Sequence, residues 1–302
     1  MTGPGAAAFL PRPAVLLKAT RPKTLWAAAA PVLIGWALAY GDGEFHLAAA
    51  LLAMAGALLI QVATNYHNDY ADFLKGTDTE ERVGPQRVTA AGLATPEQMR
   101  RATILVFGLA VLAGTYLMIR GGWPIVLVGF SAIAFGVLYT AGPKSLAYLG
   151  IADFFVLMFF GPVAVGGTYW VQALDMHPMV LVAGLAPGLL STAILLVNNI
   201  RDVDGDREAG KRTLIVRVGR PAGVWLFAGC VVVAALIPVG LLAMGSGRPG
   251  ALAAAIILLP GSVLLDRLRT VTAPRDLNPV LGRTAQLLLA YAVIFSIGWL
   301  VS

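Results

Sequence analysis

The chain has too few charged residues for a water-soluble protein. Only 13% of its 302 residues are Asp, Glu, Lys or Arg, whereas 58% are hydrophobic. Soluble globular proteins carry about 25% charged residues. A water-facing surface cannot be built from so few charges, so lipid must cover much of the molecule. The sequence therefore predicts an integral membrane protein.

Cysteine is also nearly absent, because Cys230 is the single cysteine and lies inside an apolar run. One cysteine excludes an internal disulfide and a cysteine metal site. The net charge of +6 does not indicate a nucleic-acid partner, because the basic residues stand in short loops between apolar runs. The sequence has no pattern typical of a Ser-His-Asp triad, a nucleotide-binding loop or a zinc site.

Long apolar runs are what the chain has in abundance. A membrane-spanning helix needs about 20 mostly apolar residues. Nine runs approach this length, at residues 22–41, 47–67, 101–119, 123–140, 150–171, 178–198, 222–244, 250–265 and 282–301. We therefore predict an all-α polytopic membrane protein in which nine transmembrane helices form a single domain over residues 1–302.

The basic residues alternate between the loops in a way that predicts orientation. Lys and Arg favour the cytoplasmic side of a membrane. With nine spans and a cytoplasmic N-terminus, 20 of the 22 basic residues lie inside, all except Arg120 and Arg248. An error in the number of spans would scramble this alternation. We therefore expect the N-terminus inside and the C-terminus outside.

Two acidic motifs end the second and sixth predicted spans, both on the cytoplasmic side. The first contains oxygen-bearing side chains that helical spacing places on one face, namely Asn65, Asn68, Asp69 and Asp72. The second has side chains four and eight residues apart that again share a face, namely Asn198, Asp202 and Asp206. The sequence thus predicts two sets of oxygen ligands at one membrane level.

Four clustered aspartates need cations nearby. Two like charges about 4 Å apart repel by about 4 kcal/mol at an effective dielectric constant of 20. Mg²⁺ commonly binds one or two carboxylates and keeps positions for substrate phosphates. Two such ions would hold a diphosphate between the motifs. A lone acidic pair is usually a solvated helix end, but two motifs on one side favour a metal site. An EF-hand is excluded, because Arg207 and Thr213 stand where its loop needs Gly and Glu.

At these motifs the sequence resembles the UbiA superfamily of intramembrane aromatic prenyltransferases. The resemblance rests on Asn-Asp-x-x-Asp at residues 68–72, Asp-x-x-x-Asp at 202–206, and the helix count. Further segments resemble the 1,4-dihydroxy-2-naphthoate branch of menaquinone synthesis. They are Arg21-Pro22-Lys23-Thr24-Leu25, Lys75-Gly76-Thr77-Asp78, Gly84-Pro85-Gln86-Arg87-Val88-Thr89, Tyr139-Thr140-Ala141-Gly142-Pro143 and Gly210-Lys211-Arg212-Thr213-Leu214. Gly76 stands where many members have a third Asp, and Asp153 where many have Glu.

The resemblance implies a helix bundle around a central chamber in the bacterial inner membrane, with the active site on the cytoplasmic side. The expected reaction is Mg²⁺-dependent transfer of a polyprenyl group from its diphosphate to 1,4-dihydroxy-2-naphthoate, with decarboxylation to demethylmenaquinone. The expected metal ligands are Asp69, Asp72, Asp202 and Asp206, helped by Asn65, Asn68 and Asn198. Lys144 is expected to act with them. The remaining candidate substrate-binding residues are Arg21, Lys23, Tyr70, Asp78, Arg87, Tyr139, Arg201, Lys211 and Arg212.

Two alternatives remain open from the sequence. Another acceptor, such as 4-hydroxybenzoate, would suit the same motifs. A secondary transporter fits less well, because transporters keep ionisable residues near the bilayer midplane, whereas here they gather at helix ends. The motifs also suggest an internal repeat, because Asn68 and Asn198 are 130 positions apart. We expect pseudo-repeats at about 15–145 and 146–270, followed by a ninth helix at 282–301.

Overall fold

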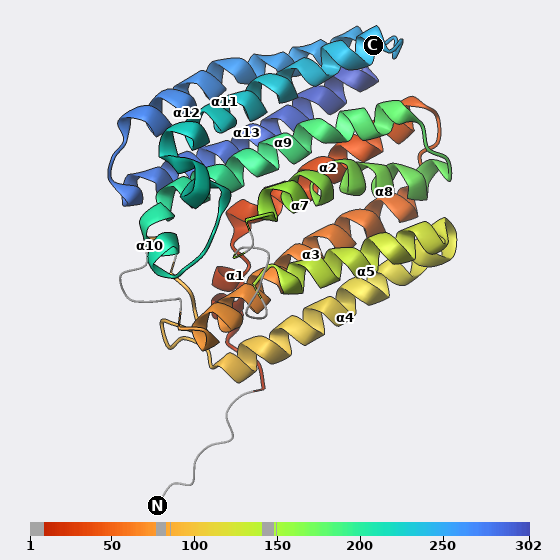
Figure 1. Ribbon diagram of the computed structural model, residues 1–302. Coiled ribbons are helices and arrows are strands. Elements are labelled where there is room, and N and C mark those ends of the chain that lie inside the picture. The colour runs from red at the N-terminus through yellow and green to blue at the C-terminus, as the bar shows by residue number, and fades with distance from the viewer. Residues whose placement is uncertain (1–8, 77–82, 85, 141–147, 149) are drawn as a thin grey trace, which may run out of the picture.

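The computed structural model describes residues 9–76, 83–84, 86–140, 148 and 150–302. Asp78 and Lys144, two of the predicted site residues, lie outside these ranges. The described residues form helices and no strands, which confirms the all-α prediction. Figure 1 shows the helices side by side, with α3, α4 and α5 on one side of the molecule and α11, α12 and α13 on the other.

Eight helical segments among the described residues are long and apolar enough to cross a membrane. They are α2 (Pro22–Gly41), α3 (Leu47–Leu74), α4 (Pro96–Gly121), α7 with α8 (Ala152–Phe159 and Pro162–Ala173), α9 (Pro178–Arg201), α11 (Leu214–Ala243), η1 with α12 (Pro249–Ile257 and Leu258–Thr270), and η2 with α13 (Pro274–Asp276 and Leu277–Leu300). The predicted fourth span is α5 (Trp123–Leu138), which has only 16 residues. Short helices α1 (Pro13–Ala19) and α10 (Val203–Glu208) complete the chain. The ninth span and the orientation stay predictions.

Several boundaries differ from the apolar runs for local reasons. The third predicted span was expected from residue 101, but α4 begins at Pro96. Thr95 caps it, because its hydroxyl accepts from the Gln98 amide while Gln98 accepts from the Thr95 amide. The predicted span 150–171 is interrupted at Gly161, and Pro162 starts a new helix. α3 continues past residue 67 to Leu74, so the first acidic motif lies on the helix itself.

The eighth segment begins as a long 3₁₀-helix. Its buried residues are Ala251, Ala254 and Ile257, spaced by three as this winding requires. Gly250 meets Gly298 of α13 closely, since a Cβ on Gly250 would lie 2.4 Å from the Gly298 carbonyl oxygen. The absence of side chains at this contact lets the two backbones pack directly.

The main core lies where α2, α8, α9, α11 and α13 meet. It contains fully buried side chains from four of these helices, including Ile34, Leu190, Phe227 and Phe295. By contrast, the outer faces of α4 and α5 carry large exposed apolar side chains, such as Leu112, Ile119 and Trp123. Exposed apolar surface of this extent suits contact with lipid.

Candidate active site

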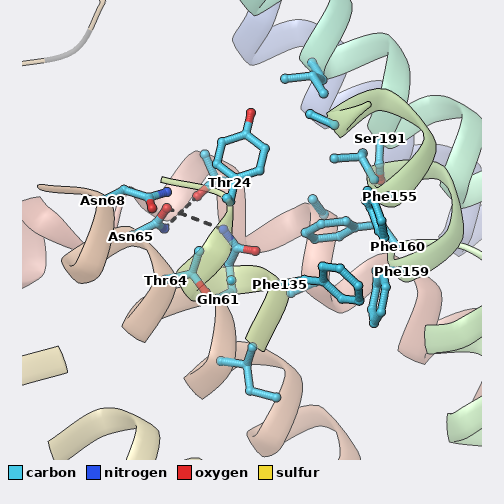
Figure 2. Close-up of a pocket in the computed structure, with 18 of the residues that line it drawn as sticks. Thr24, Gln61, Thr64, Asn65, Asn68, Phe135, Phe155, Phe159, Phe160 and Ser191 are labelled. Carbon is cyan, nitrogen blue, oxygen red and sulfur yellow. Dashed lines mark hydrogen bonds between the residues drawn. The ribbon is translucent and has the colours of Figure 1, made fainter. Parts of the chain in front are cut away.

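A cavity of about 1370 Å³ lies between α3, α4 and α5 on one side and α7, α9 and α10 on the other. Its lining follows α3 from Ala53 to Lys75, a helical distance of roughly 30 Å. Oxygen- and nitrogen-bearing side chains gather at the end that contains both acidic motifs. Elsewhere the wall is mostly apolar, and Figure 2 shows Phe135, Phe155 and Phe159 together across from Asn68.

The two asparagines of the first motif are held by hydrogen bonds from other helices. Asn65 is buried, and its amide donates to the Thr20 carbonyl at 2.8 Å and to the Thr24 hydroxyl at 3.0 Å. The Asn68 side-chain oxygen accepts from the Thr140 hydroxyl at 2.6 Å. Both asparagines line the cavity, as expected, and Asn65 also ties α3 to the start of α2.

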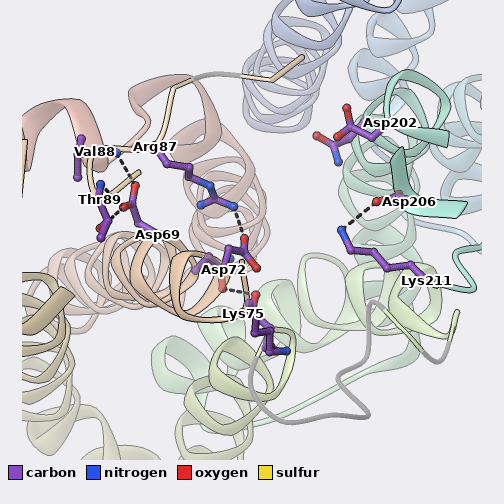
Figure 3. A network of polar contacts seen from close by, with 12 residues as sticks. Asp69, Asp72, Lys75, Arg87, Val88, Thr89, Asp202, Asp206 and Lys211 are labelled. Atoms are coloured by element: carbon purple, nitrogen blue, oxygen red, sulfur yellow. Dashed lines mark hydrogen bonds and ion pairs between the residues drawn. The ribbon is translucent and has the colours of Figure 1, made fainter. Parts of the chain in front are cut away.

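Asp69, a predicted metal ligand, points away from the cavity. Its side chain is buried and accepts from the Val88 amide at 3.0 Å, the Thr89 amide at 2.9 Å and the Thr89 hydroxyl at 2.5 Å (Figure 3). It is not part of the cavity wall. The loop contacts decide this orientation, because Asp69 stands only about 40° around the helix axis from Asn65, which does line the cavity. Asp69 therefore anchors the loop that follows α3.

Asp72 lies one turn further along α3 and does line the cavity. Its carboxylate accepts from the Arg87 guanidinium at 2.5 Å, and Arg87 is buried. Lys75, which we did not predict as a site residue, also lines the cavity. Its ammonium contacts the Thr140 carbonyl and lies 5.4 Å from the centre of the Tyr148 ring. Burial lowers the pKa of Lys75.

The second motif is organised around Arg201. Its guanidinium donates to Asp202 through two bonds of 2.7 and 2.6 Å, and to Asn198 and Asn278 at 2.8 Å each. Only 2% of its side chain is exposed. Arg201 also lines the cavity, and its predicted role as a diphosphate ligand stays a prediction. The four bonds show that it positions Asp202 and Asn198.

Asp206 pairs with Lys211 at 2.9 Å, and both line the cavity. Burial raises the pKa of the Asp206 carboxyl, while the Lys211 charge opposes that shift. Asp204, expected to be solvated, is 80% exposed and pairs with Arg207. Figure 3 shows Asp202, Asp206 and Lys211 on one side and Asp72, Arg87 and Lys75 on the other.

Tyr139 stands at the end of α5 and lines the cavity. Its role at the site stays a prediction. Arg21 lines the cavity as well, held in a left-handed backbone conformation with φ of 50°.

Three predicted substrate-binding residues are not brought to the cavity. Lys23 and Arg212 are exposed, and Tyr70 packs edge-on against His67 at 5.2 Å. Helix geometry explains Tyr70, because a residue two positions from the lining residue Asp72 faces roughly the opposite side of α3. Asn278 was missed entirely, since no local pattern marks it.

The donor groups suit Mg²⁺ that shares its coordination with a substrate, and not a metal ion enclosed by protein ligands alone. Among the described residues, no three His, Cys, Asp or Glu side chains stand close enough to hold a metal ion together. Instead the cavity has two separate sets of oxygen donors, Asn68 with Asp72 and Asn198 with Asp202 and Asp206. Mg²⁺ is usually bound by one or two carboxylates and completed by substrate phosphates, which this arrangement allows.

Sequence comparisons identify the family. The model of the UbiA prenyltransferase family matches residues 28–279. Relatives called 1,4-dihydroxy-2-naphthoate octaprenyltransferase include one from Escherichia coli (strain K12), 35% identical over 93% of this chain and 94% of the relative. Another from Mycobacterium tuberculosis (strain ATCC 25618 / H37Rv) is 37% identical over 90% of this chain and 92% of the relative.

Solved structures agree on the fold. A UbiA homolog from Aeropyrum pernix K1 superposes with a TM-score of 0.69 at 17% identity, covering 91% of this chain and 97% of the homolog. A UbiA homolog from Archaeoglobus fulgidus, bound to GPP and Mg²⁺, has a TM-score of 0.61 at 15% identity, covering 93% and 99%. Together with the family match over most of the chain, these likenesses show that the protein belongs to the UbiA prenyltransferase family.

Proposed function

We propose that this protein transfers a polyprenyl group from polyprenyl diphosphate to 1,4-dihydroxy-2-naphthoate, with loss of CO₂, giving demethylmenaquinone. One observation carries the proposal: two sets of carboxylates and bases face each other at the polar end of a long apolar cavity. The polar end suits a diphosphate, and the apolar length suits an isoprenoid tail. The acceptor is supported by the names of five curated relatives.

The diphosphate would lie between the two motifs. Asn68 and Asp72 on one side and Asn198, Asp202 and Asp206 on the other would hold two Mg²⁺ ions. When bound, Mg²⁺ neutralises a diphosphate and stabilises it as a leaving group. Among the bases that line the cavity, Arg21, Lys75, Arg87 and Lys211 would take the remaining phosphate oxygens. We also keep the prediction that Lys144 acts together with the metal-binding aspartates.

The apolar wall would protect the reacting carbon. As the allylic C–O bond breaks, its electron pair leaves with the diphosphate, and the positive charge remains on the prenyl group. A cavity lined by Phe135, Phe155 and Phe159 excludes water, which would otherwise consume this cation. The electron-rich ring carbon that bears the carboxylate then forms the new C–C bond to the prenyl cation. Release of the carboxylate as CO₂ returns an electron pair to the ring and restores its aromaticity.

The decisive experiment uses purified protein in lipid nanodiscs with Mg²⁺ and a polyprenyl diphosphate. 1,4-Dihydroxy-2-naphthoate and 4-hydroxybenzoate compete as acceptors, and mass spectrometry identifies the products. We expect a prenylated naphthoquinol that has lost CO₂. A product from 4-hydroxybenzoate alone would overturn the acceptor, and no transfer to either would overturn the proposed function.

We also propose nine spans in a bacterial inner membrane, with the N-terminus and the active site on the cytoplasmic side. The asymmetry of the basic residues supports this orientation, and α5 is apolar enough to serve as the ninth span despite its 16 residues. Reporter fusions after residues 42 and 122 would be expected to report an outside location. A cytoplasmic signal from either position would contradict the orientation.

A further inference from the structure

Asn278, on the first turn of α13, contacts two segments that are distant in sequence. Its side-chain oxygen accepts from the Arg201 guanidinium at 2.8 Å, 77 positions away. Its side-chain nitrogen donates to the Val83 carbonyl at 3.0 Å, 195 positions away. A guanidinium can only donate and a carbonyl can only accept, so these partners fix the orientation of the amide.

Both contacts lead directly to an acidic motif. On one side, Arg201 holds the Asp202 carboxylate with two hydrogen bonds and the Asn198 side chain with a third. On the other side, Val83 belongs to the loop that carries Arg87, which binds Asp72. Val83, Arg87, Arg201 and both aspartates line the cavity. Asn278 thus closes a path of contacts that joins the two motifs around the polar end of the cavity.

An amide suits this place better than other side chains of its size. Aspartate would accept from Arg201, but it has no proton for the Val83 carbonyl and would compete with Asp202 for the guanidinium. Alanine would make neither contact. Arg201 would then lose the acceptor of its Nη1 hydrogen bond. The loop that carries Val83 and Arg87 would lose its hydrogen bond to α13. Both losses would alter the spacing between the two acidic motifs without changing any residue of the motifs themselves.

We propose that Asn278 is a positioning residue that sets the spacing between the two acidic motifs, so that one Mg²⁺-bound diphosphate reaches both. This inference rests on the proposed function and adds to it a residue outside either motif. Asn278 itself touches neither metal nor substrate in this role. Its loss therefore lowers the affinity for Mg²⁺ and diphosphate before it affects folding.

The test compares wild type with N278A, N278D and D276A. Asp276 stands two residues before Asn278, is exposed, and makes no capping hydrogen bond, so D276A is a matched control. The first readout is the rise in Tm caused by MgCl₂ with inorganic pyrophosphate, since a ligand that binds the folded state raises stability with its concentration. The second readout is the Mg²⁺ dependence of prenyl transfer.

For N278A we expect the Mg²⁺ midpoint, the concentration that gives half of the maximal response, to rise about tenfold in both readouts. Losses of about this size are typical when a residue that orients a metal ligand is removed. N278D keeps the acceptor for Arg201 but loses the donor to the Val83 carbonyl and competes with Asp202, so we expect its Mg²⁺ midpoint to rise as well. D276A should match wild type. Saturating Mg²⁺ should restore much of the N278A turnover, which a folding defect would not allow.

The opposite result is equally clear. A lower yield or Tm of N278A with an unchanged Mg²⁺ midpoint would show a merely structural role and overturn the proposal, as would wild-type behaviour throughout. N278D provides the same comparison if N278A does not fold. If the wild-type protein shows neither pyrophosphate-dependent stabilisation nor transfer, the proposed function itself fails.

Discussion

Asp69 and Asp72 stand three residues apart on α3, yet their carboxylates serve different neighbours. Asp69 accepts three hydrogen bonds from Val88 and Thr89, whereas Asp72 pairs with Arg87 on the wall of the cavity. One acidic motif therefore has two tasks, anchoring the following loop and presenting a carboxylate to the cavity. The two tasks predict different mutant behaviour.

Asp69→Ala should act first on stability. It leaves the buried Val88 and Thr89 amides without their acceptor, and a buried unsatisfied donor costs about 1–3 kcal/mol. Thr89→Val, which removes only the hydroxyl bond, should cost less. Thermal unfolding in detergent micelles measures both. Normal stability of D69A together with lost Mg²⁺ dependence would instead support Asp69 as a metal ligand.

Asp72→Ala and Asp206→Ala should each lower prenyl transfer by about 100-fold or more, because each removes a carboxylate that would hold the Mg²⁺ on which the leaving diphosphate depends. Asp266→Ala is the matched control, since Asp266 is exposed and is not part of the cavity wall. It should change the rate less than about twofold, as surface substitutions usually have small effects. Full activity of D72A or D206A would refute the metal model.

Arg201→Lys tests whether shape or charge matters at the second motif. Lysine keeps the charge but lacks the planar fork that makes two bonds to Asp202. We expect R201K to lose about tenfold in activity, and R201A to lose more and to be less stable, since removing one partner of a buried ion pair costs about 3–5 kcal/mol. Arg207→Ala, at an exposed pair, is the control. Equal activity of R201K and wild type would contradict a positioning role.

Gly129→Leu should restrict the length of the isoprenoid tail. Gly129 lines the cavity ten positions before Tyr139, roughly 15 Å along α5, and a Cβ there would point into open space. A leucine would fill space that a long tail needs but that a geranyl chain does not reach. We expect the preference for long polyprenyl over geranyl diphosphate to fall about tenfold. Gly240→Leu, with open space but outside the cavity, should leave this ratio unchanged.

Gly188→Ala should destabilise the contact between α9 and the break at Gly161. A Cβ at residue 188 would lie 2.3 Å from the Leu157 carbonyl oxygen, which belongs to the backbone and cannot swing aside. Overpacking of this kind costs about 1–3 kcal/mol. Gly108→Ala meets nothing within 4 Å and should be neutral or stabilising by about 0.5–1 kcal/mol. Equal Tm values for the two variants would contradict this account.

Much of the fold follows from the sequence, because in a membrane the apolar runs dictate where helices lie. Their boundaries were harder to predict, since Thr95 and Gln98 extend α4 into polar sequence. The cavity-facing members of both motifs also follow from helical spacing. The orientation of Asp69 does not, because it depends on a loop about 20 residues further on. Asn278 has no local signature, since its partners are distant in sequence.

The 3₁₀ winding of η1 has a consequence for which mutations the chain tolerates there. A 3₁₀-helix rises about 2.0 Å per residue instead of 1.5 Å, so nine residues reach roughly 4 Å further than an α-helix would. Ala251, Ala254 and Ile257 form a straight seam along the axis. Inserting or deleting one residue turns that seam by about 120°. Exchanges among small residues should therefore be accepted at the exposed positions of this stretch, whereas a substitution of Gly250 or any change in length should not.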